Sequence, residues 1–271
     1  MSSVGPDWPP REHTHELTLD GFRLRAVILG EGPPLLAIHG TGASSHSFAG
    51  VGQLLKQQFT VIAPELPGHA GTSTPASFVP SLRETSRILS RLLRELELRP
   101  TVAVGHSAGA AVVMQMALDR TIHPDLIVGI GAALVPFRGI SRRILPTAAS
   151  LLANAGPTRW LATKAGTRRV REVLRSTGTE PSAAVVRRYQ KLASQPEHLR
   201  AVLAMMAAWE LEPLFHRLGQ VRSRCVLLAG EHDQAVPFRD QERAVRRLLD
   251  AKTVVIPNGG HLFHEEQPEL V

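Results

Sequence analysis

The five residues around Ser107 have the composition of a nucleophile elbow. Residues 105–109 read Gly-His-Ser-Ala-Gly and lie between two largely apolar runs, 101–104 and 110–114. Where a strand turns sharply into a helix, the central residue takes a strained conformation, and glycines on either side avoid collisions with the neighbouring elements. The pattern therefore predicts that Ser107 projects from the end of a strand as a nucleophile.

A serine hydroxyl needs a base, and the base needs an acid to orient it. Residues 225–230 are predicted to form a buried strand, and the loop that follows carries Asp233, the predicted acid. A short strand at 253–257 precedes Asn-Gly-Gly, whose glycines let the loop bring His261, the predicted base, back over the sheet. The chain order serine, aspartate, histidine is that of an α/β-hydrolase, and it differs from the chymotrypsin and subtilisin orders.

An acyl-transfer site also needs donors for the oxyanion of the tetrahedral intermediate. Residues 35–38 predict a buried strand that ends in the turn His-Gly-Thr-Gly at 39–42. One free backbone N–H of this turn, that of Thr41, is predicted to face the substrate oxygen. The N–H of Ala108, directly after the nucleophile, is the predicted second donor.

Other polar residues near these loops are predicted to have structural roles. His106 is expected to pack beneath the elbow, and His39 is expected to brace its loop through a hydrogen bond. His264 is expected at the surface or at a helix start. Asp125 is the rival acid, but it precedes the strand 126–130 and is therefore expected at the opposite edge of the sheet.

The composition predicts one large α/β domain with an insertion, because 271 residues with 43% hydrophobic content can bury a sizeable core. The single cysteine, Cys225, is expected in that core and excludes an intramolecular disulfide. The apolar run 126–137 is too short to span a bilayer, and residues 1–11 contain no apolar stretch typical of a secretory signal. A cytoplasmic location is therefore expected.

Strand and helix patterns alternate, which predicts a mostly parallel sheet covered by helices on both faces. Strands are expected at 22–29, 35–38 and 59–63, and an amphipathic helix at 81–98. From about residue 136 to 210, proline-interrupted helical patterns replace the strands and predict a helical cap. The expected division is a first core part at 1–135, the cap at 136–210 and a second core part at 211–271.

The cap has 13 Lys and Arg against 4 Glu and no Asp, a net charge of +9, whereas the whole chain has a net charge of +7. A solvated helical surface, an anionic membrane surface, an acidic partner and a carboxylate-bearing substrate all remain open explanations. Nucleic acid is not expected, because aromatic residues make up only 4% of the chain and no recognition module is visible.

Four large side chains of the cap are predicted either to pack between cap and sheet or to line a substrate pocket: Phe137, Met205, Met206 and Trp209. No group of residues has the spacing of metal ligands, so neither a metal nor another cofactor is predicted.

Together these motifs resemble the α/β-hydrolase superfamily over nearly the whole chain. Within it, the sequence is most similar to the magnesium chelatase accessory proteins of bacteriochlorophyll biosynthesis, through residues 7–12, 39–48, 104–111, 131–137 and 203–209. This resemblance implies a cytoplasmic or membrane-associated role connected with the insertion of magnesium into a porphyrin. It also places Val271 inside the last expected helix.

Two positions depart from the pattern of these relatives. Glu65 stands where they often have aspartate, and Ala70 stands where they often have glycine. We expect a local adjustment of the loop and no loss of chemistry.

Two functions follow from the sequence. The first is a serine carboxylesterase, with amidase, thioesterase and carbon–carbon bond hydrolase as open variants of the same chemistry. The second is an accessory protein that binds a porphyrin or contacts magnesium chelatase or a membrane through its basic cap, with a vestigial or secondary hydrolase site.

Overall fold

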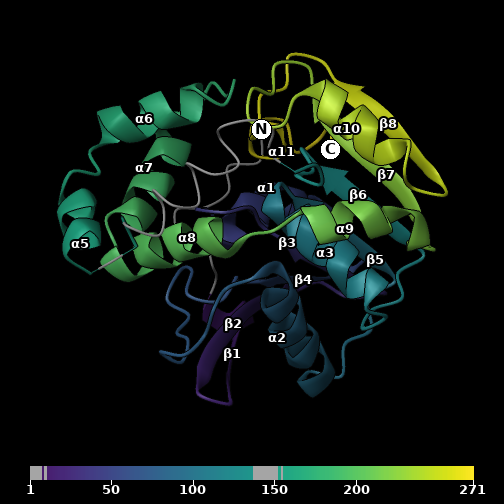
Figure 1. The fold of residues 1–271 in the computed structure, drawn as a ribbon, viewed down its shortest axis with the longest axis horizontal. Coiled ribbons are helices and arrows are strands. Elements are labelled where there is room, and N and C mark those ends of the chain that lie inside the picture. Colours follow the sequence, from purple (N-terminus) through teal and green to yellow (C-terminus); the bar gives the residue numbers. More distant parts are fainter. Residues whose placement is uncertain (1–7, 9–10, 137–151, 154) are drawn as a thin grey trace.

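The computed structural model describes residues 8, 11–136, 152–153 and 155–271. Their strands form one eight-stranded sheet in the order β1-β2-β4-β3-β5-β6-β7-β8, in which every pair from β4 to β8 is parallel (Figure 1). The first two strands run antiparallel to their neighbours. The strands are β1 Thr14–Leu19, β2 Phe22–Leu29, β3 Pro34–Ile38, β4 Thr60–Pro64, β5 Val102–His106, β6 Leu126–Ile130, β7 Arg224–Gly230 and β8 Ala251–Ile256.

Helices lie on both faces of this sheet and beside its carboxyl edge, as the sequence predicts for an α/β-hydrolase fold. The α-helices are α1 Ala49–Leu55, α2 Leu82–Glu95, α3 Ala108–Leu118, α5 Ala155–Thr163, α6 Thr167–Arg175, α7 Ala183–Ala193, α8 Pro196–Ala208, α9 Glu212–Arg217, α10 Phe238–Val245 and α11 Phe263–Glu266. Three short 3₁₀ helices, η1 Arg11–His13, η2 Ser45–Phe48 and η3 Leu218–Gln220, complete the described elements.

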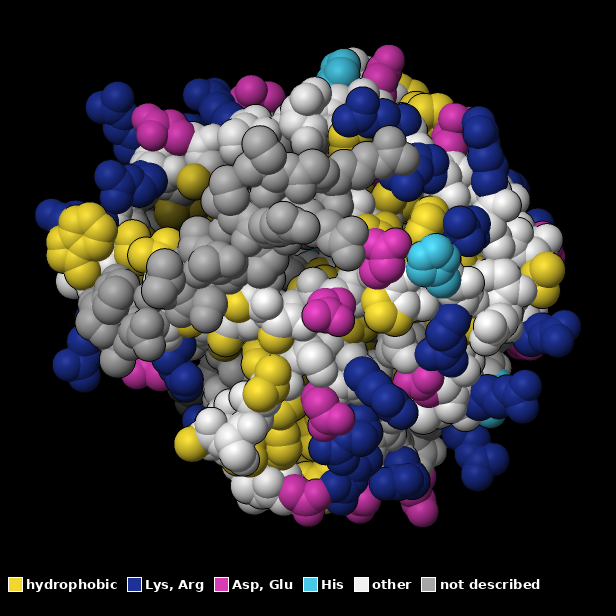
Figure 2. Space-filling model, viewed as in Figure 1, with side chains coloured by type: hydrophobic (Ala, Val, Ile, Leu, Met, Phe, Trp, Pro, Cys, Tyr) yellow, Lys and Arg dark blue, Asp and Glu magenta, His cyan; other side chains and the backbone are white. Residues whose placement is uncertain are grey.

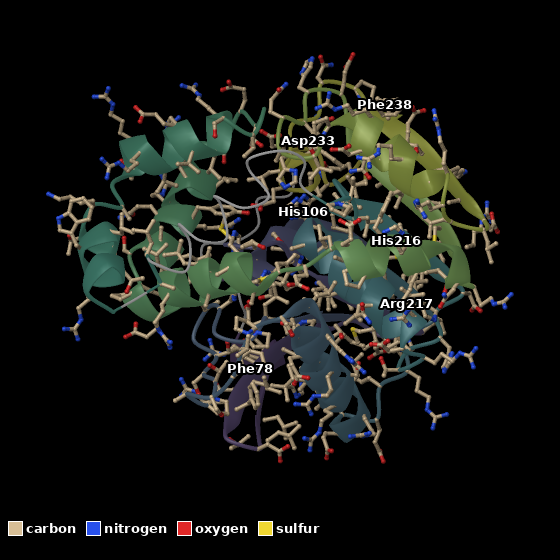
Figure 3. All side chains as sticks on the ribbon, viewed as in Figure 1. Phe78, His106, His216, Arg217, Asp233 and Phe238 are labelled. Atoms are coloured by element: carbon tan, nitrogen blue, oxygen red, sulfur yellow. The ribbon has the colours of Figure 1, made fainter. Side chains whose placement is uncertain are left out.

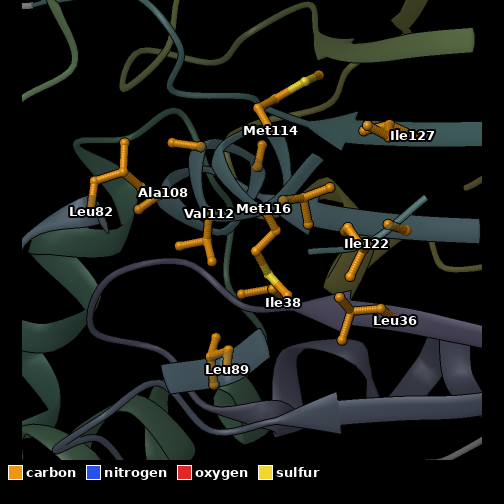
Figure 4. Close-up of a cluster of buried hydrophobic side chains, with 14 of the residues drawn as sticks. Leu36, Ile38, Leu82, Leu89, Ala108, Val112, Met114, Met116, Ile122 and Ile127 are labelled. Carbon is orange, nitrogen blue, oxygen red and sulfur yellow. The ribbon is translucent and has the colours of Figure 1, made fainter. Parts of the chain in front are cut away.

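The two-residue period of the strands divides the core between the two faces. On β3, Leu36 and Ile38 join the larger hydrophobic cluster, where they meet α2 and α3 (Figure 4). Leu35 and Ala37 point the other way, into a second cluster that includes Phe48 of η2 and Phe263 of α11. Strands buried on both faces explain why the sequence of β3 reads as a continuous apolar run.

Helix α2 is bounded by local signals at both ends. The Ser81 hydroxyl accepts a hydrogen bond from the Glu84 N–H at 3.2 Å and caps the first turn. The helix ends at Glu95, three residues before the predicted end, because Glu97 takes a left-handed conformation with φ of 55°. Strand β1, which pairs only with β2 at the sheet edge, was not among the strands predicted from the sequence.

Between β6 and α9 the described residues form the helices α5 to α8 and no strand, and these helices lie to one side of the sheet in Figure 1. We call this group of four helices the cap helices. Phe137, one of the predicted packing or pocket residues, lies outside the described residues.

Candidate active site

The strand–turn–helix at Ser107 has the geometry of the predicted elbow. Ser107 lies between β5 and α3 with φ of 51° and ψ of −116°, a region that non-glycine residues rarely adopt. A Cβ on Gly105 would lie 2.4 Å from Ala110 Cα, and one on Gly109 would lie 2.1 Å from the Ile38 carbonyl oxygen. Only glycine fits at either position, so both glycines are needed for the turn that presents Ser107.

The loops after β7 and β8 bring Asp233 and His261 into contact. His261 Nδ1 lies 2.8 Å from Asp233 Oδ2, and the Asp233 side chain is fully buried. The other carboxylate oxygen accepts hydrogen bonds from the N–H groups of Ala235 and Val236, both at 2.8 Å. Because an ionised carboxylate only accepts, Nδ1 carries the proton, and the Nε2 of a neutral His261 has a free lone pair.

Gly131 leaves room for this pair. It follows β6 with φ of 49°, and a Cβ there would lie 3.0 Å from Asp233 Oδ2 and 3.2 Å from His261 Nδ1. The sequence shows this glycine, but its role depends on a contact between three separate loops.

The residues beside the elbow have structural contacts. His106 is buried, and its Nε2 donates a hydrogen bond to the carbonyl oxygen of His261 at 3.0 Å. Burial, together with nearby His264 and His261, lowers the pKa of His106 well below its usual value, so the ring is neutral. Figure 3 shows His106 and Asp233 close together, between the cap helices and α10. The expected packing role of His106 agrees with this placement.

His264 lies near the start of α11, which is one of its two expected positions. It is completely buried, so the alternative of a surface position does not hold. Its ring lies 4.2 Å from that of His106 and 5.5 Å from that of Phe48. Burial therefore lowers the pKa of His264 to about 3. The physical reason is that α11 packs against η2 and α1, which cover it.

Asp125 and Cys225 lie away from Ser107, and His39 makes a structural contact in the loop beside it. Asp125 lies at the start of β6, where its N–H bonds to Thr101, at the edge opposite Ser107. Cys225 is buried on β7, and that burial raises the pKa of its thiol to about 12. His39 accepts a hydrogen bond from the Leu66 N–H at 3.0 Å, which is the predicted bracing contact.

Thr41 and Ala108 both lie on the wall of the cavity that Ser107 and His261 line. Ala108 is the first residue of α3, where backbone N–H groups have no partner within the helix. Neither N–H has a backbone acceptor among the described residues. Both residues thus line the same cavity as the serine, and their role as oxyanion donors stays a prediction.

The cavity has a volume of about 1130 Å³ and is lined mainly by apolar side chains of the cap helices. Met205, Met206 and Trp209 all line it, as one of the two predicted roles requires, and Trp209 also packs against the larger core cluster. Further lining residues were not predicted, because a stripe of leucine and valine on a helix is typical of ordinary core. These residues are Leu161, Val170, Val173, Leu174, Leu199 and Val202.

The two departures from the relatives' pattern are accommodated differently. Glu65 is buried, and its carboxylate accepts hydrogen bonds from the backbone N–H and the hydroxyl of Ser45 at 2.9 and 2.6 Å. Ala70 keeps the left-handed backbone that glycine favours, with φ of 45°. Its N–H donates to His198 of α8 at 3.2 Å. At Ala70 the backbone is therefore strained, whereas the Glu65 carboxylate has two hydrogen-bond donors in Ser45.

The basic side chains of the cap are spread along its outer surface. Figure 2 shows Lys and Arg over the cap helices and also over α9 and α10. On α6, Arg168 pairs with Glu172 at 3.0 Å, and Arg175 pairs with Glu180 at 3.1 Å. Arg169 is exposed and also lines the cavity, so it places a positive charge at the solvent edge of the cavity.

Within the described part of the chain, no helix is long and apolar enough to cross a membrane. The same residues contain no group of three or more His, Cys, Asp or Glu side chains placed to hold a metal ion.

Comparisons with known proteins agree with this architecture. The model of the alpha/beta hydrolase family matches residues 35–271. A magnesium-chelatase 30 kDa subunit from Rhodobacter capsulatus is 38% identical over 237 residues, which cover 87% of this chain and 82% of that protein.

Solved structures share the fold at lower identity. An alpha/beta hydrolase fold protein from Burkholderia ambifaria superposes with a TM-score of 0.81 at 21% identity, over 94% of each chain. A thermophilic esterase from Thermogutta terrifontis superposes with a TM-score of 0.76 at 22% identity, over 95% of this chain and 94% of its own.

Proposed function

Since the chain belongs to the alpha/beta hydrolase family, we propose that it is a serine hydrolase that cleaves carboxylic esters through Ser107, His261 and Asp233. One observation carries the proposal. Ser107, on its strained elbow, and His261, bonded to buried Asp233 at 2.8 Å, line the same cavity. A cavity that only bound a ligand would need neither the strained serine nor the paired carboxylate.

In the acylation step, the Ser107 oxygen attacks the ester carbonyl carbon while His261 Nε2 takes the hydroxyl proton. Asp233 keeps the proton on Nδ1 and stabilises the positive imidazolium that forms. Its own charge is stabilised by the N–H groups of Ala235 and Val236. The N–H groups of Thr41 and Ala108 hold the oxyanion, and each such donor contributes about 3 to 4 kcal/mol to lowering the barrier.

Acylation ends when His261 gives its proton to the leaving alcohol. Water then takes the place of the alcohol: His261 removes one proton from the water as its oxygen adds to the acyl carbon. His261 returns this proton to the Ser107 oxygen as the bond to the acyl carbon breaks and the acid leaves. The apolar lining of the cavity favours esters with an apolar acyl or alcohol part.

The test is hydrolysis of p-nitrophenyl esters, from acetate to long acyl chains, by the wild type and by Ser107→Ala. We expect turnover by the wild type and a loss of at least about 10⁴-fold in the variant. Ser47→Ala is the matched control, because Ser47 is a buried serine that is not among the cavity-lining residues. Equal turnover by wild type and Ser107→Ala would refute the proposed nucleophile.

A second candidate function is supported by the named relative. The magnesium-chelatase 30 kDa subunit is 38% identical, and the cap presents Arg169 beside the cavity and further basic residues outward. We therefore keep an accessory role, in which the protein holds a porphyrin carboxylate or contacts the chelatase or an anionic membrane, with ester cleavage secondary or absent.

Sedimentation with anionic and neutral vesicles at low salt tests the membrane form of this role. Binding that needs anionic lipid, weakens with salt and is lost in Arg169→Gln together with Arg171→Gln would favour it. Ser107→Ala should bind as the wild type does. A protein that stays in the supernatant with both vesicle types would count against membrane contact.

A further inference from the structure

One turn between two cap helices contacts the loops that carry both His261 and Asp233. We call residues 177–179, which connect α6 toward α7, the cap turn, and residues 257–262 the base loop. The carbonyl oxygen of Thr177 accepts hydrogen bonds from the His261 N–H at 3.3 Å and from the Gln234 N–H at 3.1 Å. A single cap residue thus bonds to the base itself and to the residue directly after the acid.

Thr179 makes the neighbouring contact with the base loop. It is fully buried, and its hydroxyl oxygen accepts a hydrogen bond from the Leu262 N–H at 3.2 Å. The Thr179 hydroxyl also lies 3.0 Å from the Thr177 hydroxyl, which itself donates to the Leu174 carbonyl oxygen at 2.6 Å.

Proton positions follow from this arrangement. Each hydroxyl has one proton, and that of Thr177 goes to the Leu174 carbonyl. Thr179 must therefore donate to Thr177, which leaves its oxygen lone pair directed to the Leu262 N–H. The hydrogen bonds run in one direction, from the base loop to the end of α6.

Glycines make the approach of the two chains possible. Gly178 has φ of 82°, and a Cβ there would lie 1.8 Å from the carbonyl oxygen of His232. A Cβ on Gly260 would lie 2.2 Å from the Gly178 carbonyl oxygen. The backbones of the cap turn and of both loops are therefore in direct contact.

The residue after the base also belongs to the hydrophobic cluster of the cap. Leu262 is buried together with α6 and α7 side chains: Val170, Leu174, Val185 and Val186. Beyond it, Glu266 accepts a hydrogen bond from the Glu180 N–H at 2.9 Å, and Glu265 accepts one from Tyr189 of α7 at 2.7 Å. Polar and apolar contacts alike join the α6–α7 pair to the segment that carries His261.

We infer that Thr179 is a positioning residue for His261, and that the α6–α7 pair holds the base and acid loops at the separation that the His261–Asp233 hydrogen bond requires. This inference rests on the proposed function for its catalytic meaning. The α6–α7 pair is consequently part of the catalytic apparatus as well as a wall of the cavity. Displacing the pair from the core would also release His261 from Asp233.

The test uses a signal that does not depend on turnover. In protein labelled with ¹⁵N-histidine, the proton on His261 Nδ1 gives a resonance that is protected from exchange by Asp233 and is assigned by its loss in His261→Gln. We expect Thr179→Val to lose or strongly broaden this resonance, because the Leu262 N–H then lacks its acceptor. Thr179→Ser, which keeps the hydroxyl, should preserve it.

Two further variants keep the test decisive. Thr179→Ala removes the same oxygen without adding a methyl group beside Thr177, and it replaces Thr179→Val if that variant does not fold. Ser81→Ala removes the N-cap hydrogen bond to Glu84 at the start of α2, a matched serine N-cap outside the α6–α7 pair and the base loop. It should leave the resonance unchanged.

Retention of the wild-type resonance in Thr179→Val and Thr179→Ala would overturn the inference. So would its loss in Thr179→Ser or in Ser81→Ala, since the effect would then not come from the Thr179 oxygen. With an ester substrate, we expect Thr179→Val to lower kcat by about 10- to 100-fold with little change in KM. Absence of wild-type ester hydrolysis would refute the proposed function, while the resonance would still decide the role of Thr179.

Discussion

At Ser107 the backbone carries strain that its neighbours enforce. Its φ of 51° persists because Gly105 allows β5 to approach α3 closely and Gly109 allows α3 to approach the end of β3. Ser107, His261 and Asp233 could be proposed as a triad from the sequence, because short glycine motifs after buried strands are visible without a structure. The sequence could not predict Gly131, since that residue acts through contacts with two loops distant in the chain.

Gly131→Ala should disturb the geometry of the His261–Asp233 pair and leave substrate binding unchanged. The new methyl group would lie 3.0 Å from Asp233 Oδ2, and the φ of 49° disfavours alanine. We expect kcat for ester hydrolysis to fall by about 10- to 100-fold with little change in KM, because Gly131 does not line the cavity. Gly52→Ala on α1, where the nearest atom would be 3.7 Å away, is the control and should retain full activity. An unchanged kcat in Gly131→Ala would contradict the crowding argument.

Among the elements, the strands and core helices can be predicted from sequence patterns, but the contacts between the cap helices and the base loop cannot. Apolar runs predict β3, β5 and β7 because burial on both faces leaves a strong signal. No pattern marks the turn at 177–179, because its importance lies in a tertiary contact with His261. Helix ends are also set by local strain, as at Glu97, which ends α2 in a left-handed conformation.

The end of α2 allows a clean stability measurement away from the site. Glu97 is exposed and has φ of 55°, and its N–H bonds to the Arg94 carbonyl oxygen at 3.0 Å. We expect Glu97→Gly to raise the free energy of unfolding by about 0.5–1 kcal/mol in urea titrations, because glycine relieves the left-handed strain. Glu97→Ala should give no such gain, and a loss of stability in Glu97→Gly would argue against strain at this position.

At the scale of the whole molecule, several histidines are buried, and burial keeps their rings neutral. Burial lowers the pKa of His46 and His264 to about 3 and that of His198 to about 4, and it lowers those of His69 and His106 well below their usual value. Burial has the opposite effect on Glu265, whose pKa rises to about 7. These groups couple stability to pH in opposite directions.

The direction of each pKa shift determines how that group changes the stability of the fold with pH. A histidine whose pKa is lower in the fold than its unfolded value of 6.5 contributes its full stability above 6.5 and loses it as pH falls toward 3 or 4. Glu265 contributes stability below 4.5 and loses it as pH rises through 7. Since several histidines oppose one glutamate, we expect stability to fall as pH drops below 6.5.

Urea titrations at pH 7.5 and pH 5 measure this effect. Each buried histidine should lower the free energy of unfolding at pH 5 by about 2 kcal/mol relative to pH 7.5. His264→Leu should reduce the difference between the two pH values, because the ring nitrogens of His264 have no hydrogen-bond partner among the described residues. Glu265→Gln should act in the opposite sense and raise stability mainly at pH 7.5. Equal wild-type stability at both pH values would contradict the expectation that the buried histidines outweigh Glu265.

The most direct test of the whole account is intact-protein mass spectrometry after brief exposure to a fluorophosphonate, followed by mapping of the modified peptide. We predict one phosphonyl group on Ser107, fast modification in the wild type, slow modification in His261→Gln and none in Ser107→Ala. A wild-type protein that stays unmodified, or that is modified at another residue at the same rate with and without His261, would contradict the proposal that Ser107 is a nucleophile activated by His261.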